Sequence, residues 1–254
     1  MASVSQTFSC AAHGVDLSAG HAASEPHKHT TSPIVTGTSV VALKYKGGVL
    51  MAADTLGSYG SLSRFTDLRR IVTTGGYTLV GSDGDYSDFQ YIQDILKELE
   101  VEDACVADGI THSPKEIWSC MARILYHRRS QMNPLWNNLV IAGFHDGETF
   151  LGTTDKIGTA YECDFVATGL GLHMAMPILR RRWKENMSEA EARELLEDCM
   201  RTLFYRDCRT INKITFAQAT KKGPAVDEPV ELSTEWSYKS FVDPKAGSET
   251  GGSW

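Results

Sequence analysis

The order in which two hydrophobic periodicities follow one another constrains the fold of this chain most. Stretches typical of β-strands occupy residues 40–53 and 70–80, and apolar residues then recur at helical spacing. The same succession is repeated before a last group of strands. A period of two favours antiparallel pairing, and helices that come in pairs can cover the two outer faces of stacked sheets. The pattern predicts an α+β fold without an internal repeat or an interdomain linker.

Three hairpins are predicted from the turns between the strands. Residues 40–45 and 49–53 flank a glycine-containing turn at residues 46–48. The other two hairpins pair residues 70–72 with 77–80 and residues 139–144 with 149–153. Strands near residues 214–219 and 230–232 are predicted to close the chain.

Two capping boxes mark where long helices begin. Ser113 precedes Glu116, and Ser188 precedes Glu191, so each hydroxyl can accept from an N–H of the first turn while the glutamate bonds back to the cap. An earlier helix has its apolar face on Phe89, Ile92, Leu96 and Leu99. A further helix is predicted after residues 169–171.

The first 35 residues differ from the rest of the chain. They are rich in Ala, Ser, His and Thr and have no hydrophobic period, which indicates a flexible leader or a removable propeptide. Four of the eight histidines lie here, namely His13, His21, His27 and His29. A metal site is the alternative, but their spacing matches no established metal motif.

Charge and cysteine content argue against several classes of protein. The net charge is −7, and the basic run 180–182 suits the C-terminal end of a helix, so a nucleic-acid interface is not expected. None of the six cysteines forms a CxxC pair, which favours buried thiols in a reducing compartment. No apolar run approaches a membrane span, and residues 1–20 lack the pattern of a secretory signal. Nothing in the sequence calls for a cofactor.

Four motifs resemble those of proteasome beta subunits and occur in the same order. They lie at residues 47–54, 82–88, 167–171 and 205–207. Together they cover most of the chain, from Thr36 to about Ala219. The resemblance implies the four-layer α-ββ-α sandwich of the amino-terminal-nucleophile hydrolases, which contains two antiparallel sheets.

Two further segments resemble one subtype of these beta subunits more closely. Residues 56–62 and 128–137 are similar to the seventh beta-type, which another naming scheme numbers four. This resemblance implies a non-catalytic subunit of the core particle, in cytoplasm and nucleus. The implied partners are neighbouring beta subunits in a seven-membered ring, the alpha ring below, and the opposite beta ring. It implies no nucleic acid and no membrane as a partner.

Proteolysis by a threonine nucleophile requires a defined set of chemical groups. Each group can be compared with one position of this sequence. A threonine hydroxyl is a poor nucleophile without a base, and an amino-terminal threonine can use its own α-amine. A nearby lysine tunes the site electrostatically, and a carboxylate orients the lysine. Further hydroxyls and a backbone N–H complete proton transfer and the oxyanion site.

Four positions retain the residue types that the family's chemistry uses, and a fifth carries threonine in place of serine. By resemblance, Thr38 falls at the nucleophile, Asp54 at the orienting carboxylate and Gly84 at the glycine whose N–H would face the oxyanion. Asp207 falls at the second carboxylate and Thr210 at the position of its companion serine. Each also has a structural interpretation, because the glycine can simply permit a turn and the carboxylates can pair with arginines.

Two positions depart from the catalytic pattern. Arg70 falls where active members carry lysine, and a guanidinium is larger, planar and effectively always protonated. Leu170 falls where active members carry serine, so a hydroxyl is lost. Loss of one oriented group typically lowers the rate by roughly 10²–10⁴-fold, and two losses predict a silent site.

Two other interpretations of the same residues remain open. One is an active threonine endopeptidase that uses Thr38, with Arg70 in place of lysine. The other is an unrelated binding module in which the motif Ala52-Ala53-Asp54 is a coincidence.

Processing of the leader follows from the predicted loss of activity. A chain that cannot cut between Gly37 and Thr38 has to be trimmed by an active neighbour. By resemblance the cut is expected near Thr30 or Thr31. The accessible polar leader would serve as the substrate.

The chain is therefore divided into three parts. We expect a leader over residues 1–37, a proteasome beta-subunit domain over 38–235 and a carboxyl-terminal arm over 236–254. The arm is expected to reach the opposite ring and to be anchored there by aromatic residues, which bury large areas at interfaces. These anchors are Trp236, Tyr238 and Phe241.

Overall fold

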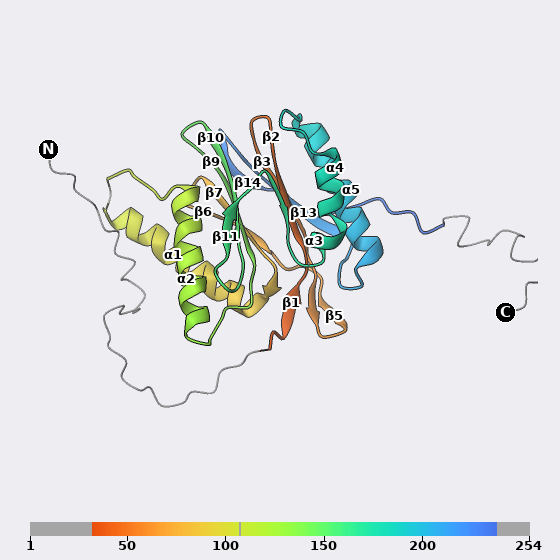
Figure 1. The fold of residues 1–254 in the computed structure, drawn as a ribbon, viewed down its shortest axis with the longest axis horizontal. Helices are drawn as coiled ribbons and strands as arrows, with labels where there is room; N and C mark the ends of the chain where they lie inside the picture. The colour runs from red at the N-terminus through yellow and green to blue at the C-terminus, as the bar shows by residue number, and fades with distance from the viewer. Residues whose placement is uncertain (1–31, 107, 238–254) are drawn as a thin grey trace, which may run out of the picture.

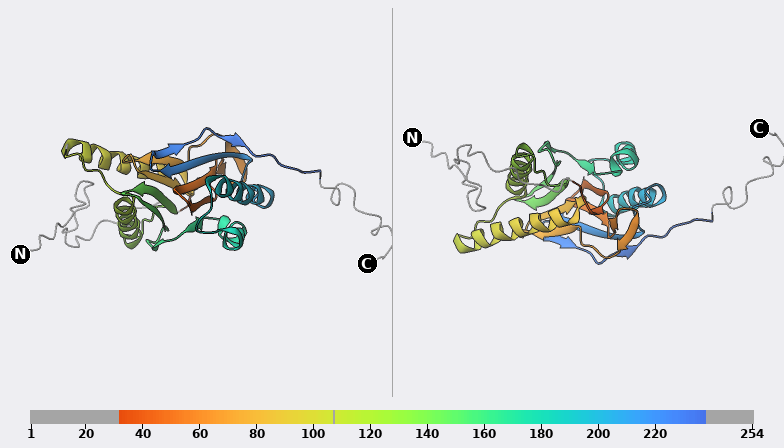
Figure 2. Two further views of the ribbon diagram at one scale, coloured as in Figure 1. Left: turned by 90° about the horizontal axis from the view of Figure 1, so that it is seen from above. Right: turned by 90° about the horizontal axis from the view of Figure 1, so that it is seen from below.

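Two β-sheets lie face to face between two layers of helices in the computed structural model, which describes residues 32–106 and 108–237 (Figure 1). Helices α1 (Tyr86–Val106) and α2 (Pro114–Ser130) cover one outer face. Helices α3 (Gly171–Met174), α4 (Met176–Arg182) and α5 (Glu189–Arg206) cover the other, as the views from above and below also show (Figure 2). The predicted four-layer α-ββ-α sandwich is confirmed.

The sheet beneath α1 and α2 contains five antiparallel strands. In spatial order they are β11 (Ala160–Glu162), β10 (Glu148–Thr154), β9 (Leu139–His145), β7 (Thr78–Ser82) and β6 (Ile71–Thr74). Two of the predicted hairpins, β6–β7 and β9–β10, belong to this sheet and are confirmed.

The sheet beneath α3–α5 is antiparallel as well. In spatial order its strands are β12 (Phe165–Ala167), β2 (Val40–Tyr45), β3 (Gly48–Asp54), β13 (Lys213–Thr220) and β14 (Gly223–Val226), with β15 (Val230–Glu231) also on β13. The predicted β2–β3 hairpin and the closing strands are confirmed.

Strands β2 and β3 are apolar throughout because both of their faces are buried. Val41 and Leu43 point toward the helices and pack in one core with α5, whereas Val40 and Ala42 pack in the core between the two sheets. A third core joins the other sheet to α1 and α2. Burial on both faces makes these strands read as continuous apolar runs.

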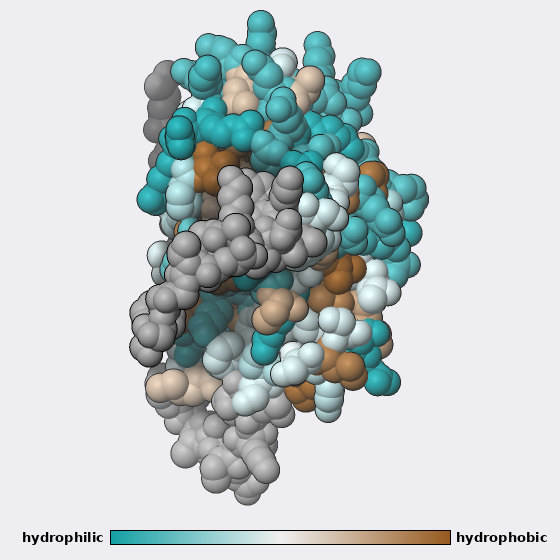
Figure 3. All heavy atoms as spheres, turned by 90° about the vertical axis from the view of Figure 1, so that its right-hand side faces the viewer, coloured by the Kyte–Doolittle hydropathy of each residue, from teal (hydrophilic) through white to brown (hydrophobic). Residues whose placement is uncertain are grey.

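Both predicted capping boxes are present. The Ser113 hydroxyl accepts from the Glu116 N–H while the Glu116 carboxylate accepts from the Ser113 N–H, and Ser188 and Glu191 repeat the arrangement at α5. The basic run 180–182 ends α4, as predicted. The outer face toward α4 and α5 is predominantly hydrophilic, with separate hydrophobic patches (Figure 3).

A small sheet was not predicted from the sequence. It contains β5 (Leu62–Phe65), β4 (Gly57–Tyr59), β1 (Val35–Gly37) and β8 (Gly84–Asp85), in that spatial order. It lies at one end of the sandwich, below the two large sheets in Figure 1. The last three residues of the expected leader, Val35–Gly37, therefore form β1.

The cysteines are free thiols wherever the structure describes them, but they are not uniformly buried. Cys199 is buried, which raises the pKa of its thiol to about 12. Cys105 and Cys208 are exposed, so the expectation of buried thiols is wrong for these two. Among the described residues, no helix is both long and apolar enough to span a membrane.

Candidate functional site

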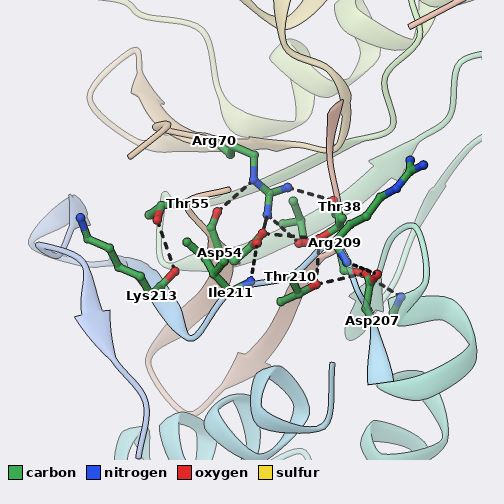
Figure 4. A network of polar contacts seen from close by, with 12 residues as sticks. Thr38, Asp54, Thr55, Arg70, Asp207, Arg209, Thr210, Ile211 and Lys213 are labelled. Carbon is green, nitrogen blue, oxygen red and sulfur yellow. Dashed lines mark hydrogen bonds and ion pairs between the residues drawn. The ribbon is translucent and has the colours of Figure 1, made fainter. Parts of the chain in front are cut away.

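The residues compared with the catalytic pattern converge where the small sheet meets β2 and β3 (Figure 4). Thr38 lies between β1 and β2, Asp54 ends β3, and Arg70 immediately precedes β6. Asp207 and Thr210 lie between α5 and β13. Segments far apart in the sequence thus bring five of the seven predicted positions into one network.

The hydroxyl of Thr38 belongs to a short chain of polar groups. It lies 3.2 Å from the Thr210 hydroxyl and donates over 3.5 Å to Asp54 Oδ1. The Thr210 hydroxyl donates in turn to Asp207 Oδ2 at 3.1 Å. A general base takes a proton over about 2.6–3.2 Å, so the contact with Asp54 is longer than such a transfer needs.

The Arg70 side chain fills the centre of this network. It is buried, and its Nε donates to the Asp54 carbonyl at 2.9 Å. Its Nη1 donates to the carbonyls of Thr38 at 2.8 Å and Ser82 at 3.3 Å. Its Nη2 donates to the Ser39 carbonyl at 3.1 Å and forms an ion pair with Asp54 Oδ1. The guanidinium thereby joins β3, β7 and the start of β2.

Asp54 is occupied by partners other than a reacting group. Burial raises the pKa of the Asp54 carboxyl, and the Arg70 guanidinium opposes that shift. The backbone N–H groups of Ile211 and Leu56 oppose it as well, the former donating to Oδ2 at 3.3 Å. Both carboxylate oxygens therefore hold structural hydrogen bonds.

Strand β1 holds the residues that precede Thr38 by pairing along both of its edges. Thr36 pairs with Ser58 of β4 on one side and with Asp85 of β8 on the other. Gly37 lies against Arg70, since a Cβ on this glycine would approach Arg70 Cδ to 2.5 Å. The segment ahead of Thr38 is therefore paired on both sides, and a free α-amine at Thr38 would require cleavage of the peptide bond that follows Gly37.

Gly84 has a structural reason to be glycine. Its φ is +78°, and a Cβ there would lie 1.8 Å from the Trp136 carbonyl oxygen. Gly84 is also paired with Gly37 in the β1–β8 ladder. The backbone of β8 is thus engaged by the chain's own strand at the predicted oxyanion position.

Leu170 is separate from the polar network. It is half-buried at the start of α3. Next to it, the Gly171 N–H donates to the Ser39 hydroxyl at 2.8 Å. The Ser39 carbonyl accepts from Arg70 Nη2. The sequence did not point to Ser39 as a member of the site.

A second polar cluster beside the site was also missed. The buried Asp83 carboxylate accepts from the Asn138 backbone N–H at 2.8 Å and from its side-chain amide at 2.9 and 3.0 Å. Burial raises the pKa of Asp83. The Asn137 amide donates to the Ser82 hydroxyl and to the carbonyls of Asp83 and Asp85. Two adjacent asparagines, Asn137 and Asn138, directly ahead of the apolar strand β9 were the available signal.

The remaining predicted positions lie at the two ends of the chain. Trp236 packs edge-on against Phe204 and Tyr205 of its own α5, with ring centroids 5.6 and 5.0 Å apart. The other positions lie outside the described residues, namely Thr30, Thr31, Tyr238, Phe241 and the four leader histidines. Within the described ranges, no cluster of His, Cys, Asp and Glu could hold a metal ion.

Comparison with known proteins agrees with the fold. A family model described as "Proteasome subunit" matches residues 34–219. The proteasome subunit beta type-4 of Xenopus laevis is 46% identical over 85% of this chain and 90% of its own length. The beta type-4 subunit of Arabidopsis thaliana is 46% identical over 91% and 94%. The beta type-7 subunit of Saccharomyces cerevisiae is 41% identical over 78% of each chain.

Proposed function

Because the chain belongs to the proteasome subunit family, we propose that it is a beta subunit that builds the protease without performing its chemistry. Its role is to complete the beta ring and to help join two half-particles. The relatives carry the names beta type-4 and beta type-7, and membership of the family implies assembly with other proteasome subunits.

One observation carries the proposal, namely the environment of Arg70. Its guanidinium is buried, donates to backbone carbonyls and pairs with the Asp54 carboxylate. A lysine would tune the site as a compact ammonium, whereas a planar guanidinium that is fixed in this way cannot take that role for Thr38. The alternative of an active threonine endopeptidase is disfavoured on the same ground.

The finer features of the assembly belong to the same proposal. The chain would occupy one position of a seven-membered beta ring, above an alpha ring, in cytoplasm and nucleus. Residues 38–235 would form the subunit body and residues 236–254 an arm toward the opposite ring. Residues ahead of Thr30 or Thr31 would be removed by an active neighbour, which would leave β1 in place.

Covalent labelling of the purified assembly tests the proposal. An epoxyketone or vinyl-sulfone probe should label active subunits of the same preparation, which serve as the internal positive control, and leave Thr38 unmodified. Intact-protein mass should show that the mature chain begins upstream of Thr38. Labelling of Thr38, or a mature chain that starts at Thr38, would overturn the proposal.

A further inference from the structure

Large exposed side chains gather at the carboxyl-terminal end of α2 and in the turn after it, together with one from α1. Met132 is 81% exposed, and no other large hydrophobic residue in the described part of the chain is exposed to a greater fraction. Tyr126 and Tyr91 are 55% and 46% exposed. With Arg128 and Arg129 these residues form one surface, called here the α2-turn patch.

Backbone and side-chain hydrogen bonds connect the members of the patch and hold the turn rigidly. The Met132 N–H donates to the Arg129 carbonyl at 3.1 Å. The Asn133 N–H donates to the Arg128 carbonyl at 3.1 Å, and Arg128 Nε donates back to the Asn133 carbonyl at 3.0 Å. The exposed methionine is therefore displayed on a fixed backbone.

The backbone of Met132 has a conformation that disfavours its side chain. Its φ is +56°, and Asp146 is the only other non-glycine residue with a positive φ in the described ranges. Glycine is the default residue at such a position, and a long apolar side chain is unusual there. A strained residue that gains no burial from its own chain points to a role outside that chain.

The two arginines of the patch are directed toward aromatic rings instead of carboxylates. The Arg128 guanidinium lies 5.7 Å from the centroid of Tyr91, and that of Arg129 lies 5.4 Å from the centroid of Tyr126. Neither forms an ion pair within the described residues. Burial raises the pKa of the nearby Asp88, and the Arg128 guanidinium opposes that shift, so Arg128 already has a carboxylate close by. Arg129 therefore supplies the uncompensated positive charge of the patch.

We propose that the α2-turn patch is a contact surface for a neighbouring subunit of the assembly. That neighbour offers an apolar pocket to Met132 and at least one carboxylate to Arg129. Tyr, Met and Arg are the residue types enriched at protein interfaces. A second copy of the chain does not fit as the partner, because two such patches would bring four arginines together. The inference rests on the proposed assembly function and locates one contact within it.

Replacement of Met132 by glycine separates an interface role from a local one. Met132→Gly removes the side chain and suits the positive φ, so the thermal midpoint of the isolated chain should stay equal or rise. In cells where the variant is the only copy, its fraction in the full particle on native gels should fall at least threefold. Asp146→Gly makes the same backbone change at the other positive-φ position and should leave that fraction unchanged.

Charge reversal gives the second, independent measurement. Arg129→Glu should lower incorporation at least threefold, whereas Arg129→Lys keeps the charge and should lower it less. Unchanged incorporation of both Met132→Gly and Arg129→Glu would overturn the inference while leaving the proposed function intact. If the wild-type chain itself were absent from the full particle, the proposed function would fail first.

Discussion

Arg70 Nη1 donates to the backbone carbonyl of Thr38 at 2.8 Å, so the residue at the position predicted for lysine holds the backbone of the candidate nucleophile. The same guanidinium pairs with Asp54, whose carboxylate would otherwise be buried without a counter-charge. One side chain at the position predicted for lysine thus cross-links β3 and β7 with the start of β2.

Replacing Arg70 by alanine should destabilise the fold strongly. Removal of one partner leaves Asp54 as an uncompensated buried charge, which typically costs about 3–5 kcal/mol. Urea denaturation of the purified chain should show this as a lower midpoint. Arg70→Lys keeps a charge near Asp54 but lacks the planar set of donors, so its loss should be smaller. A loss below about 1 kcal/mol for the alanine variant, the value typical of surface pairs, would contradict this account.

Asp83 should make stability depend on pH in a defined direction. Burial raises its pKa above the ordinary 3.8, so the protonated form is favoured in the folded state. Its contribution is fully present below that ordinary value and is lost as the pH rises through the folded-state pKa.

Asp83→Asn, which keeps the shape and removes the titration, isolates this effect. The variant should gain stability relative to wild type as the pH rises from about 4 toward neutrality, by at most about 1.4 kcal/mol per pH unit. A constant offset is expected as well, because the Asn138 amide donates to the native carboxylate. Denaturant midpoints of both proteins across this range measure the difference. A flat difference, or one that falls with pH, would show that burial does not control this carboxyl.

The long elements of the fold could be predicted because their signals are local. Ser113 and Ser188 determine helix starts through groups three residues away, and β2 and β3 are apolar throughout. The short strands carry no such signal. Strand β1 contains only Val35, Thr36 and Gly37, and its existence depends on partners in β4 and β8 that are distant in the sequence.

The site was predictable as a set of residue types but not as a set of contacts. Resemblance identified Thr38, Asp54 and Arg70, and the structure brings them together. The carbonyls that accept from the guanidinium, including that of Ser39, have no signature in the sequence because every residue has a carbonyl. Asp83 and its amide partners were missed for a related reason, since pairing across more than 50 residues follows only from the fold.

Mutation of the candidate nucleophile should leave maturation unchanged. Thr38→Ala removes the hydroxyl that autolysis would need, while β1 remains paired on both sides. If an active neighbour trims the leader, intact-protein mass of the purified assembly should differ from wild type only by the substitution. The two hydrogen bonds of this hydroxyl are long, at 3.2 and 3.5 Å, so their removal should change stability by no more than about 1 kcal/mol. Accumulation of the full-length precursor would indicate autolysis at Gly37–Thr38 instead.

The carboxyl-terminal segment should divide into a docked part and a part that serves assembly. Arg201 Nε donates to the Ser233 carbonyl at 3.1 Å, and the Glu235 N–H donates to the Tyr205 hydroxyl at 2.7 Å. Together with the edge-on packing of Trp236, these hydrogen bonds hold residues 233–236 against α5. The two parts can therefore be removed separately.

A chain that ends at Ser237 keeps the docked part, and a chain that ends at Leu232 loses it. Both should fold, because the three cores involve no residue beyond Leu232. The shorter chain should be less stable by roughly 1–3 kcal/mol, the combined value of the aromatic packing and the hydrogen bonds. Because both truncations remove the part of the proposed arm (residues 236–254) that lies beyond Ser237, both should accumulate half-particles on native gels, to a similar extent. Trp236→Ala in the full chain, which weakens docking alone, should reproduce the stability loss with little effect on half-particle joining. Normal joining of the chain that ends at Ser237 would show that the arm is dispensable and would restrict the structural contribution of this subunit to its folded body.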